Sequence, residues 1–208
     1  MFDFGGGTLD VTVVRNDPGG LRVLDTGGLD DLGGADIDAA LVDHLARGGG
    51  PAWPRLVAPR GPADLRDRHL VWTEVRAAKE MLSRATVAPV RVPGSERSTH
   101  LTRDELQAAA GPLVDRAVDE TGRVLHRSGV GPGTLDAILL VGGSSRLPLV
   151  AGRLHARFGV VPVVPEQPEL PVAYGALLGG PAPGDAVTAG PVLGGVAPGG
   201  AGSGGPVL

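Results

Sequence analysis

Apolar and polar positions alternate at the N-terminal end of the chain. Segments 1–4 and 9–14 are rich in apolar and β-branched residues and flank three consecutive glycines, which is typical of two strands joined by a turn. Asn16-Asp-Pro-Gly-Gly20 is a second strong turn signal, and a third strand is predicted over residues 21–26. The pattern predicts an antiparallel meander whose opening strand is short.

Two later segments carry apolar residues at helical spacing. Over Ala35–Arg47 and over Asp64–Arg84 these residues recur at intervals of three and four, which predicts two amphipathic helices. Residues 48–62 are rich in glycine and proline and are expected to form a loop. Residues 86–92 predict a short strand.

A capping box begins the next predicted helix. In Thr102-Arg-Asp-Glu105 the threonine hydroxyl and the glutamate carboxylate can satisfy backbone amides that have no partner at a helix start. The helix is expected to run to about Ser128. Gly111-Pro112 should kink or divide it, because proline removes a donor and clashes with the preceding turn.

The C-terminal third alternates between strand and helix patterns. Leu135–Val141 is an almost unbroken apolar run, which predicts a strand buried on both faces. A helix is predicted over Leu147–Phe158, a strand over Val160–Val164 and a last helix over about Pro171–Leu178. The order β-β-β-α…α-β-α-β-α predicts an α/β fold with helices packed on a sheet.

Composition limits the classes of function. The 208 residues include 42% hydrophobic and 20% charged residues, enough for one domain or two small ones with a real core. Residues 181–208 contain one charge among many glycines and prolines, and we expect a disordered tail there. The net charge of -4 offers no clustered basic face, so we expect no nucleic-acid partner.

Two absences from the sequence narrow the chemistry. There is no cysteine, which excludes disulfides, thiolate nucleophiles and cysteine-ligated metal sites. There is also no apolar run near the roughly 18 residues of a membrane span, and no basic-then-apolar signal opens the chain. We therefore expect no membrane association and a cytoplasmic location.

The glycine turn near the N-terminus is the first candidate site. In Asp3-Phe-Gly-Gly-Gly-Thr-Leu-Asp10 the glycines let the backbone approach an anion, successive amides can form an anion-binding nest, and Thr8 adds a hydroxyl donor. Asp3 and Asp10 bracket the turn and could hold a hydrated magnesium ion or orient a water. A glycine-rich hairpin turn with two solvated carboxylates is an equally good interpretation of this segment alone.

The turn after the 135–141 run is the second candidate site. Ligands bind at the carboxyl ends of strands in open α/β sheets, and the two glycines of Gly142-Gly-Ser-Ser-Arg146 open space for a base or a sugar. Ser144 could hydrogen-bond the edge of a purine, and Arg146 could stack on its face. Taken alone, a strand-to-helix turn whose glycines merely pack closely is the slightly better interpretation.

Both candidate sites belong to an ordered set of motifs. Asp3–Asp10 resembles the second phosphate motif of the actin-like ATPase superfamily, and within it of the seventy-kilodalton heat-shock chaperones of the DnaK type. Further segments resemble successive motifs of that family: Leu32–Asp38, Val75–Ser83, Leu101–Leu106, Leu139–Pro148 and Val172–Ala176. The resemblance spans residues 2–180. It implies that residues 1–180 form the second lobe of an actin-like, ribonuclease H-like α/β ATPase domain, with a small subdomain inserted at about residues 41–92.

The resemblance also implies site residues and cofactors. ATP or ADP would be bound with Mg²⁺ and a monovalent cation such as K⁺, held by Asp3 and Asp10. Thr8 and Asp10 would be the catalytic residues. The contacts to the β- and γ-phosphates would come from Gly5, Gly6, Gly7 and Thr8. The adenosine would lie between Lys79 and Ser83 on one side and Gly142, Gly143, Ser144 and Arg146 on the other. Without the resemblance, Lys79 is better interpreted as a solvated residue on an amphipathic helix.

The sequence departs from the family pattern in two places and lacks one part of it. Arg76 stands where the family commonly has a glutamate that reaches the ribose, and Glu169-Leu-Pro171 stands where it has Asp-Glu-Ala. The first lobe's Asp-Leu-Gly-Thr-Thr phosphate loop, catalytic lysine and water-positioning glutamate are absent from this sequence. We therefore expect a second-lobe fragment that begins inside the lobe's first strand, binds adenine nucleotide and does not hydrolyse ATP alone. Whether Met1 is the natural start stays open.

The resemblance implies a parent function in ATP-dependent protein folding, with unfolded client proteins and co-chaperones as partners. Two alternatives stay open. One is another actin-like ATPase, such as a sugar kinase or a cell-shape filament protein. The other is a non-catalytic module that binds adenine nucleotide weakly, or not at all, and regulates a partner.

Overall fold

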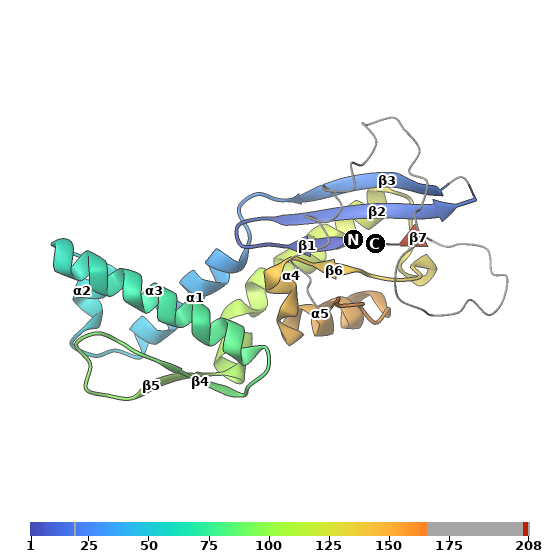
Figure 1. Cartoon of the computed structure of the whole chain (residues 1–208). Helices are drawn as coiled ribbons and strands as arrows, with labels where there is room; N and C mark the ends of the chain where they lie inside the picture. The colour runs from blue at the N-terminus through green and yellow to red at the C-terminus, as the bar shows by residue number, and fades with distance from the viewer. Residues whose placement is uncertain (19, 166–205, 208) are drawn as a thin grey trace.

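The main sheet is built from segments at both ends of the described chain. The computed structural model describes residues 1–18, 20–165 and 206–207. The strand order is β3-β2-β1-β6, and β7 also pairs with β2. These strands are β1 (Phe2–Phe4), β2 (Leu9–Asp17), β3 (Gly20–Leu29), β6 (Leu140–Val141) and β7 (Pro206–Val207). Figure 1 shows β2 and β3 as the two long strands of a mixed α/β structure.

The first three strands form the predicted antiparallel meander. β1 pairs with β2, and β2 pairs with β3, in both cases antiparallel. In the first pair Phe2 lies opposite Val11 and Asp3 lies opposite Asp10. Successive side chains of a strand point to opposite faces, and Phe2 and Val11 are accordingly in the core while the two aspartates lie on the other face.

The two candidate motifs meet at one edge of this sheet. β1 pairs in parallel with β6, so that Phe2 lies opposite Leu140 and Asp3 opposite Val141. Parallel strands have their carboxyl ends on the same side. The glycine turn that follows β1 and the turn that follows β6 therefore begin next to each other.

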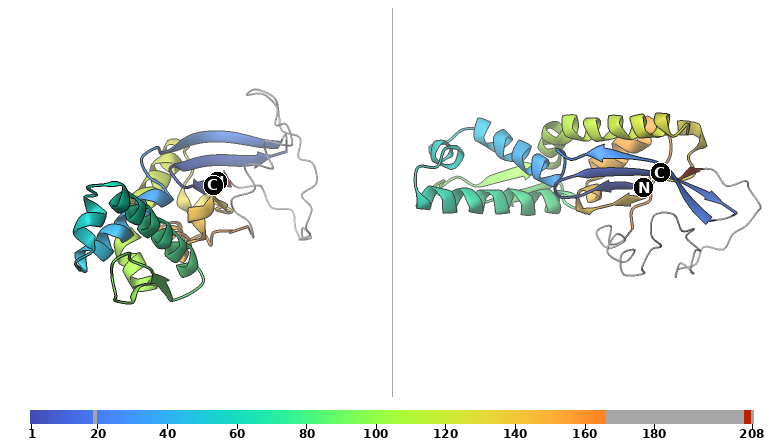
Figure 2. Two further views of the ribbon diagram at one scale, coloured as in Figure 1. Left: turned by 60° about the vertical axis from the view of Figure 1, so that its left-hand side comes forward. Right: turned by 90° about the horizontal axis from the view of Figure 1, so that it is seen from above.

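Helices cover one face of the main sheet. α4 (Arg103–Arg127) packs against β2 and β3, and α5 (Pro148–Phe158) packs against α4. Seen from above in Figure 2, α4 runs lengthwise beside the sheet. α1 (Gly34–Arg47) follows β3 and packs against both α4 and α3 (Pro62–Leu82).

A second group of elements lies beyond the end of the main sheet. It contains α2 (Trp53–Val57), α3 and a two-stranded antiparallel sheet of β4 (Val87–Val90) and β5 (Thr99–Thr102). Figures 1 and 2 place this group at the end of the molecule opposite to β7. Its apolar residues pack into one buried cluster that continues into the main core: Val71, Val75, Ala88, Val90 and Leu101.

The predicted capping box starts α4. Thr102 Oγ1 accepts a hydrogen bond from the Glu105 amide at 3.2 Å, and Glu105 Oε2 accepts one from the Thr102 amide at 2.8 Å. The hydrogen bond from the Thr102 backbone, more than any other contact, lowers the pKa of Glu105. The helix continues through Pro112 to Arg127, so of the two expected effects of Gly111-Pro112, a kink or a division, the division does not occur.

Three further local expectations are wrong, and one strand was not predicted. The predicted loop over residues 48–62 contains α2, which begins beside Pro54 and is held in place by the buried Trp53 and Leu56. β5 has no counterpart among the predicted elements. Of the run 135–141 only Leu140–Val141 are in a strand, and the strand expected over 160–164 is reduced to one bridge between Leu139 and Val163. An apolar run specifies burial, and the length of a strand depends on the partners available on either side.

Other expectations fall outside the part of the chain that the structure describes. These are the helix over residues 171–178 and the tail over 181–208, apart from the two residues of β7. In the described ranges, no helix is both long enough and apolar enough to cross a membrane.

Candidate functional site

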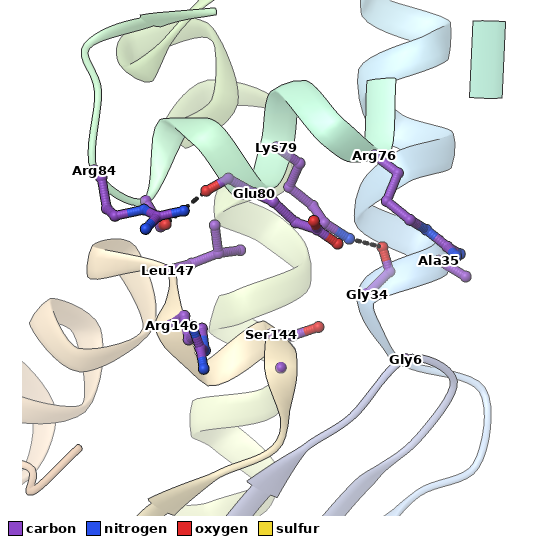
Figure 3. Close-up of a pocket in the computed structure, with 12 residues that line it drawn as sticks. Gly6, Gly34, Ala35, Arg76, Lys79, Glu80, Arg84, Ser144, Arg146 and Leu147 are labelled. Atoms are coloured by element: carbon purple, nitrogen blue, oxygen red, sulfur yellow. Dashed lines mark hydrogen bonds between the residues drawn. The ribbon is translucent and has the colours of Figure 1, made fainter. Parts of the chain in front are cut away.

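A pocket of about 430 Å³ lies where four segments of the chain converge. These segments are the glycine turn after β1, the start of α1, the last turns of α3 and the turn after β6. Figure 3 shows side chains from α3 on one side of this space and the 143–147 segment on the other. The lining residues are Gly6, Gly34, Ala35, Arg76, Lys79, Glu80, Ser83, Arg84, Gly143, Ser144, Arg146 and Leu147.

Backbone carbonyl groups of the glycine turn accept hydrogen bonds from the neighbouring segments. The Gly5 amide donates to the Thr8 carbonyl at 3.0 Å and closes the turn. The Gly5 carbonyl accepts from the Gly34 amide at 3.0 Å and from Ser144 Oγ at 2.8 Å. Because the carbonyls are used in this way, the turn is held against both α1 and the segment after β6.

Neither backbone conformation nor packing requires glycine at positions 6 and 7. Neither Gly6 nor Gly7 has a positive φ, and a Cβ added to either would meet no atom within 4 Å. Both are exposed. Glycine at such positions leaves the backbone open to close approach from outside, which is the property that an anion-binding turn needs.

The Gly33-Gly34 pair lets α1 begin in direct contact with this turn. A Cβ on Gly33 would lie 2.5 Å from the backbone of Gly7. A Cβ on Gly34 would lie 2.4 Å from Ser144 Oγ and 3.1 Å from Lys79 Nζ. The four segments can close around the pocket only because these positions carry no side chain.

α3 turns a polar face toward the pocket. Arg76, Lys79, Glu80 and Ser83 lie along this face at helical spacing. Lys79 is buried, with 7% of its surface exposed, and its Nζ donates to the Gly34 carbonyl at 2.8 Å. The same Nζ lies 2.8 Å from Asp38 Oδ1. The interpretation of Lys79 as a solvated surface residue is therefore wrong.

The turn after β6 forms the opposite wall. Gly142 has a φ of +83°, and a Cβ on it would lie 2.5 Å from Asp3 Oδ1 and from the Phe4 carbonyl oxygen. Glycine is required there both by backbone conformation and by the approach of β1. Ser144 is buried, whereas the Arg146 side chain is exposed and lines the pocket.

Asp3 and Asp10 form a pair of carboxylates beside the glycine turn. They are direct cross-strand neighbours, and Thr8 Oγ1 donates to Asp10 Oδ2 at 3.2 Å. Burial, and to a lesser degree the charge of Asp10, raises the pKa of Asp3. Two such carboxylates next to open space fit a hydrated Mg²⁺, which prefers oxygen ligands and keeps several waters. Among the described residues, no group of three or more acidic or histidine side chains is placed to hold a metal.

The predicted site residues fall into two groups. Six line the pocket: Gly6, Lys79, Ser83, Gly143, Ser144 and Arg146. The others lie next to it on the glycine turn, its flanking strands and the start of the opposite wall: Asp3, Gly5, Gly7, Thr8, Asp10 and Gly142.

Sequence reasoning did not assign a site role to the other lining residues. These are Gly34, Ala35, Arg76, Glu80, Arg84 and Leu147. For Gly34 a signal was present, because two glycines directly before an amphipathic helix indicate close packing at its start. Position 76 was noted only as a departure from the family pattern. Arg76 lies three residues before Lys79 and Glu80 three residues before Ser83, so helical spacing from the two predicted residues could have found both.

Comparison with known proteins identifies relatives of the chain. Residues 1–189 match the family model described as Hsp70 protein. The chain is 35% identical over 181 residues to a protein of Bordetella petrii named chaperone protein HscA homolog, and 36% identical over 182 residues to one of the same name from Burkholderia pseudomallei. Both alignments cover 86% of this chain and 28% of the relative, so the chain spans little more than a quarter of the length of these relatives. Because the family model matches residues 1–189 of the 208, this protein belongs to the Hsp70 family.

Proposed function

We propose that this chain forms the second lobe of an actin-like nucleotide-binding domain and supplies one side of a site for ATP or ADP with Mg²⁺. The observation that carries the proposal is the pocket at which the glycine turn, the start of α1, α3 and the turn after β6 converge. Membership of the Hsp70 family disfavours a sugar kinase or a filament protein. We propose a small subdomain at about residues 41–92, inserted in a lobe over residues 1–180; α2, α3 and β4 fall within this range, and β5, the strand that pairs with β4, follows it.

The phosphate end of the proposed site is the glycine turn. Gly5, Gly6, Gly7 and Thr8 would contact the β- and γ-phosphates, because open glycine backbone and a hydroxyl suit oxygen anions. Asp3 and Asp10 would hold Mg²⁺, with a monovalent cation such as K⁺ nearby. The bound cation would offset the repulsion between the two carboxylates.

The adenosine end would lie between α3 and the turn after β6. Lys79 and Ser83 come from the first wall, and Gly142, Gly143, Ser144 and Arg146 come from the second. Arg146 lines the pocket with its exposed side chain, and a guanidinium plane in that position can stack on a purine.

The wider activity is proposed from the relatives, which are named as chaperones. We propose that the site serves an ATP-dependent chaperone with unfolded clients and co-chaperones as partners. Phosphoryl transfer depends on several groups positioned around the γ-phosphate. The sole lysine of the sequence, Lys79, is already engaged by the Asp38 carboxylate and the Gly34 carbonyl. ATP turnover would therefore need groups that these 208 residues do not supply.

A titration with ADP and Mg²⁺ tests the proposal. The chain should bind ADP weakly, with a Kd above about 1 μM, because only one side of the site is present. Gly143→Leu should block binding, since the Cβ of residue 143 meets open space and the side chain would fill the pocket. Gly133→Leu is the matched control, because Gly133 is equally open but does not line the pocket. Absence of ADP binding, or binding that Gly143→Leu leaves unchanged, would overturn the proposal.

A further inference from the structure

Asp38 is the most deeply buried charged group beside the pocket. It lies on α1, four residues after Gly34, and only 1% of its surface is exposed. A carboxylate buried to this extent is costly unless cations or donors surround it. Neither the proposed phosphate contacts nor the proposed adenosine contacts use it, so its presence needs a separate explanation.

Two cations of α3 surround Asp38. Lys79 Nζ lies 2.8 Å from Oδ1, and Arg76 Nε lies 3.3 Å from Oδ2. In the described part of the chain Oδ1 receives no hydrogen bond of good geometry, so its contact with Lys79 is an ion pair. The Asp38 carboxylate thus holds the positive charges of Lys79 and Arg76 at the pocket wall, and its own negative charge offsets one of the two.

The ion pair explains how a lysine can be part of this wall. Burial of a lysine with a charged ammonium group is costly unless partners surround that group. Asp38 and the Gly34 carbonyl each take one side of Nζ, which carries three N–H donors. At least one N–H donor of Lys79 remains for a ligand, and the contacts with Asp38 and Gly34 fix the position of Nζ.

We infer that Asp38 is a positioning residue of the nucleotide site, whose buried carboxylate fixes the Lys79 ammonium in the pocket wall and draws Arg76 to the pocket rim. This inference rests on the proposed function, because Lys79 is the group that would contact the ligand. A purely structural alternative is that the pair only joins α1 to α3. The two readings differ in what Asp38→Asn does to ligand binding when the fold is intact.

A double-mutant cycle on ADP binding separates the two readings. Asp38→Asn keeps the shape of the side chain and should weaken ADP binding about tenfold or more, because Lys79 loses its place. In a Lys79→Met background the same change should have almost no further effect. Asp31→Asn is the matched control, since Asp31 lies seven residues earlier and pairs with Arg116 on the surface.

A second readout does not depend on ADP. Lys79 is the only lysine in the sequence, so acetylation by an amine-selective reagent, followed by mass spectrometry of the peptide that contains it, reports on one side chain. Asp38→Asn should raise the acetylation rate several-fold, because Nζ loses its anchor and reaches solvent. ADP should slow the reaction in the unaltered chain.

Each possible result has a distinct meaning. Equal ADP affinity of the Asp38→Asn variant and the unaltered chain, or additive effects in the cycle, would overturn the inference. So would an acetylation rate that Asp38→Asn leaves unchanged, even if no ADP bound. Absence of ADP binding by the unaltered chain would instead overturn the proposed function. If Asp38→Asn alone does not fold, the double variant Asp38→Asn with Lys79→Met should fold, because it removes both buried charges and leaves neither unpaired. Failure of this double variant to regain stability would also count against the Asp38–Lys79 ion pair.

Discussion

Asp3 and Asp10 lie directly opposite each other across the β1–β2 ladder, on the face of the hairpin that points away from the core. Like charges in this relationship destabilise a sheet. Burial and the neighbouring charge both raise the pKa of Asp3, so its ionised form is disfavoured. A pair that costs folding free energy and adjoins an open glycine turn supports a role in binding a cation.

Asp3→Asn should therefore stabilise the fold. The change keeps the shape of the side chain and removes one of two opposed charges, which is worth about 0.2–1 kcal/mol for a cross-strand pair. Urea unfolding at neutral pH measures the gain. The same variant should lose any enhancement of ADP binding by Mg²⁺. Asp31→Asn is the control, because Asp31 is largely exposed and pairs with Arg116 instead.

The gain from Asp3→Asn should depend on pH. Because the pKa of Asp3 is raised in the folded state above the unfolded value of about 3.9, the folded state binds more protons between these two pKa values. The free energy of unfolding therefore falls as pH rises through that window, and the penalty is complete above the folded pKa. The stability difference between variant and unaltered chain should be larger at pH 7 than at pH 4. An equal difference at both pH values would contradict this origin.

Gly34→Ala should disrupt the pocket, because the added methyl group would collide with two residues that line it. The added Cβ would lie 2.4 Å from Ser144 Oγ and 3.1 Å from Lys79 Nζ, so both side chains must move. Overpacking of this kind costs about 1–3 kcal/mol, and ADP binding should be lost with it. Gly152→Ala is the matched control: Gly152 lies in α5, its Cβ would meet open space, and the change should stabilise the helix by about 0.5–1 kcal/mol. Equal ADP affinity in both variants would show that Gly34 is not at the site.

Short-range patterns in the sequence predicted most of the fold. The meander, α1, α3, α4 and α5 follow from local periodicity, turn residues and the Thr102–Glu105 capping box, all of which act within one or two turns of the chain. α2 and β5 depend instead on tertiary burial and on strand pairing. α2 forms in a glycine- and proline-rich segment because Trp53 and Leu56 find a buried environment. β5 exists because β4 offers it a partner.

The site was only partly predictable for the same reason. Motif order indicated which segments belong together, and the pocket does contain residues from each of the main ones. Sequence could not show that Lys79 is buried, because that depends on Asp38, 41 positions earlier and on another helix. The two glycines before α1 indicated close packing there, but the sequence did not show that the packing partners of Gly34 are Ser144 and Lys79.

Thr102→Ala should destabilise the chain by removing the cap of α4. The hydroxyl accepts from the Glu105 amide, and loss of such a cap costs about 0.5–2 kcal/mol. The midpoint of urea unfolding should fall. Thr73→Ala is the control, because Thr73 lies on the exposed face of α3 and its hydroxyl donates to the His69 carbonyl; it should leave the midpoint nearly unchanged. If both variants behave alike, the capping box contributes nothing measurable.

Arg146→Ala tests the adenosine wall. The guanidinium lines the pocket from the turn after β6, and stacking on a partly desolvated purine contributes about 1–2 kcal/mol, so ADP affinity should fall roughly 5- to 30-fold. The melting temperature should hardly change, because the side chain is exposed. Arg153→Ala is the matched control, since Arg153 is an exposed arginine of α5 that pairs with Asp115.

A second ligand separates stacking from simple charge attraction at Arg146. Inorganic pyrophosphate carries phosphates but no base, so stacking predicts that Arg146→Ala weakens the binding of ADP and leaves that of pyrophosphate almost unchanged. Long-range attraction by a cation would weaken both, and it would fade as salt is raised, because exposed charges more than a Debye length apart are screened. An equal loss for both ligands would move Arg146 to the phosphate end of the site. Unchanged ADP affinity in a folded variant would remove the turn after β6 from the adenosine wall.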